Sequence, residues 1–155
     1  MTEWISGIWE NLLGDVAFAV LASVASYLFF RWRSGISALR GNKSLSPDSK
    51  QVLFESGKHL FVADKDGLRQ LTKRGQDRYP QWSPDSRLIA YSSLVKENWD
   101  VWIVEAKTGK TVQLTTAKGP ERPIGWNERG DLLVNMGGAT LIVNRNEIEK
   151  RLRDG

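Results

Sequence analysis

Cysteine is absent from this 155-residue sequence, and histidine occurs only once, as His59. Without cysteine the chain can form no disulfide, no thiolate nucleophile and no cysteine-based zinc site. A single imidazole likewise excludes zinc sites that are built on several histidines. The sequence also lacks a G-x-S-x-G nucleophile elbow, a phosphate-binding glycine loop and an H-E-x-x-H motif. We therefore predict that the protein is not an enzyme and uses no cofactor.

The excess of positive charge is small. Lysine and arginine number 22 against 18 acidic residues, which gives a net charge of +4 and a pI near 9.5. This balance allows attraction to anionic lipid but is too weak to indicate a nucleic-acid partner. With 41% hydrophobic and 26% charged residues, the composition is that of a folded chain with one modest core.

One long apolar run stands near the N-terminus. The run VAFAVLASVASYLFF, from Val16 to Phe30, carries no charge, and aromatic residues flank it on both sides. With its flanks, about 12–32, it has the length needed to cross a hydrocarbon core of ~30 Å. A signal peptide is disfavoured because no basic residue precedes Arg31, and an in-plane helix is disfavoured because the run has no polar face. We predict a single transmembrane helix within segment 1–33, and a buried core helix is the remaining alternative.

Basic residues follow this run but do not precede it. Arg31, Arg33, Arg40 and Lys43 all lie on its C-terminal side. The positive-inside rule then predicts a single-pass protein of the bacterial inner membrane, with the N-terminus outside and the rest of the chain in the cytoplasm. The segment 34–43, SGISALRGNK, is basic and rich in small residues, so we interpret it as a juxtamembrane linker.

Small side chains form a stripe along the predicted helix. They are Ala19, Ala22, Ser23 and Ser26, whose spacing of i, i+3, i+4 and i+7 puts them on one face. Such a stripe lets a second helix approach closely and favours self-association. Alanine and serine are also common in membrane helices without that role, and the sequence leaves the two interpretations open.

A repeated pattern fills the rest of the chain, with a period of roughly forty residues. The phrase Ser-Pro-Asp-Ser occurs at 46–49 and at 83–86, each time before a charged residue and an apolar strand. The segment HLFVAD at His59 matches DVWIVEA at Asp100. A weaker third copy, around Trp126, has NERG in place of the phrase and no counterpart of the last strand. About four short strands in each period indicate β-propeller blades.

The repeated phrase has a mechanical explanation. Proline at the second position of a turn fixes φ, and the adjacent aspartate or serine can accept backbone N–H groups. Alternation in RLIAYSS and DVWIVEA gives each strand two faces for neighbouring blades. We therefore interpret Asp85 as a turn-capping residue and not as a catalytic carboxylate.

These segments resemble the repeats of TolB-type, WD-like β-propellers. The similarity rests on W-S-P-D-S at 82–86, the apolar strand after it, D-V-W-I-V at 100–104 and Q-L-T at 113–115, and it covers about 44–144. It implies a mainly β fold, a partial β-propeller of about three four-stranded blades. It implies no particular activity, because such propellers serve as protein-binding modules, sensors and companions of peptidases. TolB itself is a soluble periplasmic protein with a full ring, and this chain departs from it in blade number and in the predicted helix.

Three blades are too few to close a ring, which needs ~4 to 8. Two chains would supply six, so we predict a homodimer or higher homo-oligomer in which the open ends complete one another. The alternative is one curved array capped by the charged tail 145–155. In that tail Asn146 could cap a short helix with Glu147–Arg151 and Glu149–Arg153 pairs. The sequence does not decide between the two.

Two functions fit these features. The first is a membrane-anchored scaffold that holds an unknown protein partner near the bilayer. The second is a ligand-gated membrane effector, whose cytoplasmic propeller binds a small anionic, nucleotide-like signal. Candidate ligand residues are Arg78, Tyr79, Trp82 and Arg122, because arginine can bind phosphate through two hydrogen bonds while an aromatic ring stacks beside it. Solvated surface arginines are the simpler interpretation.

Overall fold

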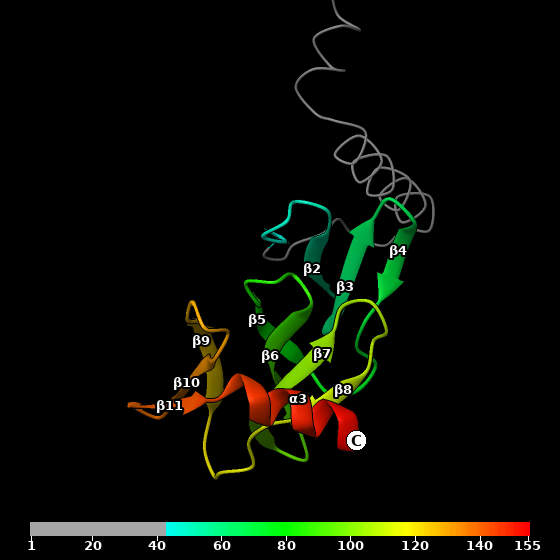
Figure 1. The fold of residues 1–155 in the computed structure, drawn as a ribbon. Coiled ribbons are helices and arrows are strands. Elements are labelled where there is room, and N and C mark those ends of the chain that lie inside the picture. Colours follow the sequence, from blue (N-terminus) through cyan, green and yellow to red (C-terminus); the bar gives the residue numbers. More distant parts are fainter. Residues whose placement is uncertain (1–42) are drawn as a thin grey trace, which may run out of the picture.

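The computed structural model describes residues 43–155, which form three antiparallel sheets and one C-terminal helix (Figure 1). The predicted transmembrane helix at about 12–32, its stripe (Ala19, Ala22, Ser23, Ser26) and nearly all of the linker lie outside the described residues. Within 43–155 the structure contains no helix with the length and apolar character that a membrane crossing requires. The strands are β1 (Lys43–Leu45), β2 (Val52–Ser56), β3 (His59–Asp64), β4 (Gly67–Gln70), β5 (Asp77–Trp82), β6 (Leu88–Val95), β7 (Asn98–Glu105), β8 (Thr111–Gln113), β9 (Glu121–Trp126), β10 (Leu132–Met136) and β11 (Ala139–Val143), and the helix is α3 (Arg145–Asp154).

Each sheet is a meander of consecutive strands. The first has the order β1-β2-β3-β4, the second β5-β6-β7-β8 and the third β11-β10-β9. The mainly β fold is therefore confirmed. The third sheet has three strands and not the four of a complete blade, because the chain turns into helix α3 directly after β11.

The second sheet lies between the other two, and both of its faces are buried. Alternation along β6 sends Ile89 and Tyr91 into one apolar cluster with Leu53 and Leu60 of the first sheet. The alternate residues, Leu88 and Ala90, belong to a second cluster with Leu132 and Val134 of the third sheet. The period of two in a strand thus supplies an apolar residue to each neighbour in turn.

The two Ser-Pro-Asp-Ser turns fold in the same way. Asp48 accepts a hydrogen bond from Ser46 Oγ at 2.7 Å, and Asp85 accepts one from Ser83 Oγ at 2.6 Å. Each carboxylate also accepts the backbone N–H two residues later, at 3.1 and 3.2 Å. The Asp48 N–H donates to Ser86 Oγ at 3.0 Å, so the first turn contacts the second. The interpretation of Asp85 as a turn-capping residue is confirmed.

Helix α3 packs against the second and third sheets. Ile148 and Leu152 are buried in the apolar cluster between these sheets. The helix begins after Asn144, whose side chain accepts the N–H of Asn146 at 2.9 Å, so the cap is Asn144 and not Asn146 as the sequence suggested. Asn144 is the N-cap because it precedes the first helical residue, and its Oδ1 reaches an N–H that has no intrahelical partner.

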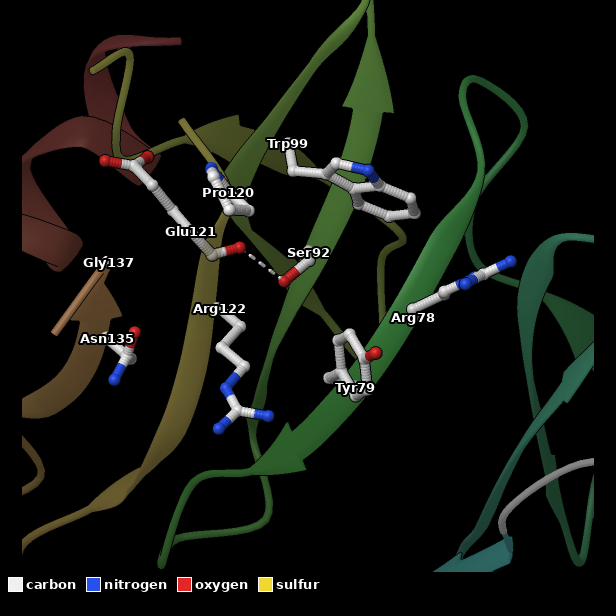
Figure 2. A pocket seen from close by; sticks show the side chains of 9 residues that line it. All are labelled: Arg78, Tyr79, Ser92, Trp99, Pro120, Glu121, Arg122, Asn135 and Gly137. Atoms are coloured by element: carbon white, nitrogen blue, oxygen red, sulfur yellow. Dashed lines mark hydrogen bonds between the residues drawn. The ribbon is translucent and has the colours of Figure 1, made fainter. Parts of the chain in front are cut away.

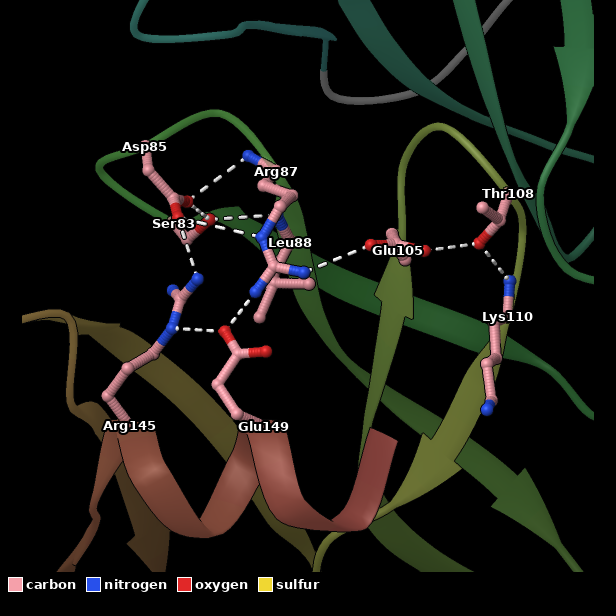
Figure 3. A network of polar contacts seen from close by, with 9 residues as sticks. All are labelled: Ser83, Asp85, Arg87, Leu88, Glu105, Thr108, Lys110, Arg145 and Glu149. Carbon is pink, nitrogen blue, oxygen red and sulfur yellow. Dashed lines mark hydrogen bonds and ion pairs between the residues drawn. The ribbon is translucent and has the colours of Figure 1, made fainter. Parts of the chain in front are cut away.

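Ion pairs join α3 to the second sheet (Figure 3). Arg145 donates to Asp85 of the turn at 2.6 Å and to Glu149 at 2.8 Å. Arg87 pairs with Glu149 and, at 3.0 Å, with Glu105. Asp85 therefore has a second role beyond its turn, because it holds the first turn of the helix against the β5–β6 connection.

The two ion pairs predicted within α3 have different outcomes. Glu147 and Arg151 pair at 2.7 Å, as predicted. Glu149 faces the second sheet and pairs with Arg87 and Arg145, so the predicted pair with Arg153 is wrong. Two guanidinium groups held in place by the sheet and by the preceding helical turn satisfy this carboxylate instead.

We expect Ile148→Ala to lower the free energy of unfolding by about 2–5 kcal/mol, because it removes a fully buried side chain from the cluster under α3. Lys150→Ala on the exposed side of the same helix is the matched control and should change stability little. Urea unfolding followed by circular dichroism measures both. Equal effects of the two substitutions would show that α3 does not contribute to the core.

Candidate functional site

Three of the four predicted ligand residues line one pocket. It is a cavity of about 320 Å³ beside β5 and β9, the first strands of the second and third sheets (Figure 2). Arg78 and Tyr79 come from β5 and Arg122 from β9, and these occupy equivalent places in successive repeats. The full lining is Arg78, Tyr79, Ser92, Trp99, Pro120, Glu121, Arg122, Asn135 and Gly137.

Each arginine of the pocket lies over an aromatic ring. The Cζ of Arg78 is 5.4 Å from the centre of the Trp99 ring, and the Cζ of Arg122 is 5.9 Å from that of Tyr79. Both distances fall within the range of cation–π contacts, about 6 Å. Neither guanidinium makes an ion pair within the described part of the chain. The pocket therefore presents two guanidinium groups that stack on aromatic rings and make no ion pair in residues 43–155. Burial raises the pKa of the nearby Glu55 carboxyl, and the charge of Arg78 opposes this rise.

The backbone at Tyr79 is unusual. Its φ is +56°, in the left-handed region that non-glycine residues rarely adopt, and it sits where the β5–β6 register shifts between Arg78 and Gln81. Tyr79 is 47% exposed, so apolar burial does not explain its position. The bulge turns the ring into the pocket, and strain of this kind is often found at binding sites.

Trp82, the fourth predicted ligand residue, does not line the pocket. It is 9% exposed and packs in the cluster between the first and second sheets. Its Nε1–H donates to the carbonyl oxygen of Ser44 at 3.3 Å, which further ties the first sheet to the second. Trp82 is the last residue of β5 and faces inward, so its ring lies in the core. Tyr79 lies at the bulge earlier in the same strand and lines the pocket.

Glu121 has a different role from the other lining residues. Its backbone carbonyl accepts a hydrogen bond from Ser92 Oγ at 2.8 Å, which ties β9 to the second sheet. Its carboxylate is directed away from Arg122 and Tyr79 (Figure 2). The side chain is buried, and neither carboxylate oxygen has a hydrogen-bond partner in the described residues. The neighbouring Thr115 hydroxyl accepts the N–H of Val101 at 2.8 Å.

The equivalent position one repeat earlier, Asp77, is fully satisfied. Asp77 accepts hydrogen bonds from Thr72 and from Ser93, the latter at 2.6 Å, and its Oδ2 lies 3.4 Å from His59 Nδ1. In the third repeat the longer Glu121 stands in this place, and Asp100 replaces the histidine.

Burial raises the pKa of the Glu121 carboxyl above its usual 4.5, the Thr115 hydroxyl opposes this, and the negative charge of Asp100 raises it further. This junction of sheets thus holds two buried carboxyl groups, Asp100 and Glu121, where the previous junction holds one carboxylate and a histidine.

Sequence reasoning identified three of the nine lining residues, and of those it missed, Trp99 and Glu121 matter most to the site. Trp99 belongs to the longer β6–β7 hairpin of the second copy, which has no counterpart in the first, so no repeat comparison indicates its stacking on Arg78. For Glu121, the sequence indicated no more than its position directly before Arg122. Its alignment with Asp77 could have indicated a buried position.

We expect Glu121→Gln to stabilise the protein at neutral pH, because burial and the charge of Asp100 disfavour the ionised Glu121 carboxylate and the amide carries no charge. The folded-state pKa is raised, so the wild type loses stability as pH rises from 4.5, the unfolded value, through the folded value. The two proteins should therefore converge below pH 4.5 and diverge above it. Urea unfolding across this window measures the difference, with exposed Glu128→Gln as the control. Parallel pH profiles would contradict the prediction.

Comparison with known sequences gives one partial match. No protein family model matches the chain. The Tol-Pal system protein TolB of Hahella chejuensis (strain KCTC 2396) is 38% identical over 63 residues, which is 39% of this chain and 15% of that protein.

Solved structures share the arrangement of sheets. The putative TolB from Agrobacterium tumefaciens matches 69% of this chain and 44% of its own, with a TM-score of 0.58 and 21% identity. The tricorn protease matches 70% of this chain and 12% of its own, with a TM-score of 0.61 and 16% identity. The matched part covers less than half of each of these proteins. At these identities the likeness concerns the fold, and it confirms that the three sheets are similar to TolB-type β-propeller blades.

Proposed function

We propose that this protein is a non-catalytic interaction module, held at the inner membrane, whose pocket between the second and third sheets binds acidic groups of a partner protein. The observation that carries the proposal is the pair of arginines, Arg78 and Arg122, which are stacked on aromatic rings and make no ion pair in residues 43–155. A stacked guanidinium keeps its hydrogen-bond donors free for a carboxylate.

The arginines involved in the fold behave differently. Arg69, Arg87, Arg145 and Arg151 each pair with a carboxylate of this chain. Aromatic residues and arginine are also the residue types enriched at protein interfaces, because they bury large areas and form directional contacts. The pocket combines both types, together with the exposed ring of Tyr79.

The directions of the two guanidinium groups favour a protein partner over one small anion. Figure 2 shows Arg78 and Arg122 extending to different sides of the Tyr79 ring. A single phosphate or carboxylate would meet one of them, whereas two acidic side chains on one partner could meet both. The ring between them offers an apolar surface to the residues that separate the two acids.

The membrane tether is part of the proposal. The run at 12–32 has the length and flanking aromatic residues of a single span, and its basic flank, Arg31 to Lys43, favours a cytoplasmic position for the sheets. The first described strand begins at Lys43, so the sheets would follow the membrane closely. Such a tether confines the pocket to partners near the bilayer and raises their effective concentration.

A second candidate function is a sensor for a small anionic ligand. The cavity of about 320 Å³ is within the size range of small-molecule sites, roughly 300–1,000 Å³. In this case the ligand would bind one stacked arginine and change the environment of its ring. Titration of the purified full-length chain in detergent with ADP, followed by tryptophan fluorescence, tests this alternative, because Trp99 is the ring under Arg78.

We expect a photo-crosslinking amino acid at Tyr79 to capture a discrete partner in cells, because that ring is exposed in the pocket. The double substitution Arg78→Gln and Arg122→Gln should remove most of this adduct while protein levels stay the same, since both side chains are exposed. The same crosslinker at exposed Lys150 is the control position. An adduct at Tyr79 that survives the double substitution would contradict the role of the arginines. Saturable ADP binding without an adduct would favour the sensor.

We expect the full-length protein to sediment with membranes and to resist extraction by high salt, because its apolar run would lie in hydrocarbon. Deletion of 1–33 should release the remaining chain into the soluble fraction. Protease added outside spheroplasts should spare residues 43–155, as the charge distribution predicts. Digestion of these residues by external protease would reverse the proposed orientation.

A further inference from the structure

The outer edge of the third sheet is uncovered. In β11 every residue from Ala139 to Ile142 is exposed, and Leu141 and Ile142 are exposed by 39% and 61%. The first and second sheets each have a fourth strand, β4 and β8, whereas the third ends at β11. The backbone groups along this edge therefore have no strand to bond with in residues 43–155.

Helix α3 does not cover this edge. It leaves β11 toward the second sheet, where Arg151 donates to the carbonyl oxygens of Gln113 and Leu114 at 3.4 and 2.7 Å. Its apolar residues, Ile148 and Leu152, pack in the cluster between the second and third sheets. Figure 1 shows α3 crossing from the end of β11 to β8. The helix thus fills the space between the second and third sheets and leaves the outer edge of β11 open.

The exposed edge strand lacks the residue types that usually protect such an edge. Residues 137–143, GGATLIV, contain no charge and no proline. Natural edge strands are normally protected by charged side chains, proline, bulges or a covering element, because an open apolar edge pairs with other chains. An edge without such protection is therefore expected to have a partner strand.

The turn before β11 fixes which backbone groups face outward. Gly137 and Gly138 form a two-residue turn with φ values of +66° and +113°, and Met136 pairs with Ala139 beside it. The pair that flanks a two-residue turn is a hydrogen-bonded pair, and such pairs alternate along an antiparallel ladder. Ala139, Leu141 and Val143 therefore bond to β10, while the N–H and C=O groups of Thr140 and Ile142 point away from the sheet.

We propose that this edge pairs with β11 of a second copy of the chain, antiparallel and about a two-fold axis at Leu141. In this register Thr140 of each copy exchanges two hydrogen bonds with Ile142 of the other. Leu141 lies opposite Leu141 in the non-hydrogen-bonded pair on the axis. The two third sheets become one six-stranded sheet, and an isologous contact of this kind closes on itself.

The edge is self-complementary, which favours a second copy as the occupant. Across the axis, Ala139 meets Val143 and Thr140 meets Ile142, which are apolar or β-branched cross-strand pairs. No charge lies in β11, so the two-fold places no like charges opposite each other.

A head-to-tail ring is less consistent with the structure. In such a ring the first strand of one chain would complete the third sheet of the next. Here β1 already pairs with β2 of its own sheet, from Lys43 opposite Phe54 to Leu45 opposite Val52. The face of the first sheet that is turned away from the second is also not free, since Phe54 is 2% exposed and stacks on Phe61. The two-fold arrangement needs neither of these surfaces.

The absence of cysteine makes a direct test possible. In the full-length chain, Leu141→Cys places one thiol from each copy in the pair on the axis, at the ~4.5 Å Cα separation that suits a disulfide. We expect this variant to form a disulfide dimer under mild oxidation at least about tenfold faster than Lys65→Cys, an exposed control in the β3–β4 turn. Equal rates for the two variants would overturn the proposal.

A second pair of variants separates assembly from folding. Thr140→Pro removes an outward N–H and leaves the β10 ladder intact, so we expect a folded monomer by sedimentation in detergent. Leu141→Pro removes an N–H bonded to β10 and should destabilise the third sheet itself. A wild-type chain that is monomeric at tens of micromolar, or a Thr140→Pro variant that remains dimeric, would overturn the two-fold pairing. These outcomes do not depend on the pocket, so they are distinct from failure of the proposed function.

Discussion

Burial of both faces of the second sheet is the constraint on which the rest of the structure depends. A sheet whose strands carry apolar residues on both faces needs another layer of structure packed against each face. Leu88 and Ile89, neighbours in β6, enter different clusters for this reason and are both fully buried. The two Ser-Pro-Asp-Ser turns follow the same stacking, because the Asp48 N–H of the first turn donates to Ser86 Oγ of the second.

The pocket is a consequence of this stacking. The second and third sheets meet where the first strand of the third sheet, β9, lies against β5, β6 and β7, and the pocket lies beside the first strands, β5 and β9. The second and third copies of the repeat each place an arginine at this point, and the bulge at Tyr79 adds a ring between the two. The rings of Trp99 and Tyr79 position the two guanidinium groups, and we propose that these groups bind acidic side chains of a partner.

The C-terminal helix α3 covers the space between the second and third sheets and does not cover the outer edge of the third. Within residues 43–155 the chain forms helix α3 directly after β11 and adds no fourth strand to the third sheet. Helix α3 covers the apolar cluster between the second and third sheets with Ile148 and Leu152, and ion pairs of Arg87 and Arg145 hold it there. The exposed edge is the consequence, and its lack of charge distinguishes it from an ordinary protected edge.

The sequence by itself determined the features that depend on short spacing. Turn chemistry around Asp48 and Asp85, the three repeats, the missing last strand and the grouping of Arg78 with Arg122 all follow from residues close together or from a regular period. Only the tertiary structure decided what depends on contacts between distant segments. It placed Trp82 in the core beside Ser44, paired Glu149 with Arg87, and buried Glu121 near Asp100. A side chain's partner across two sheets is set by how the sheets pack, and periodicity along one strand does not contain that information.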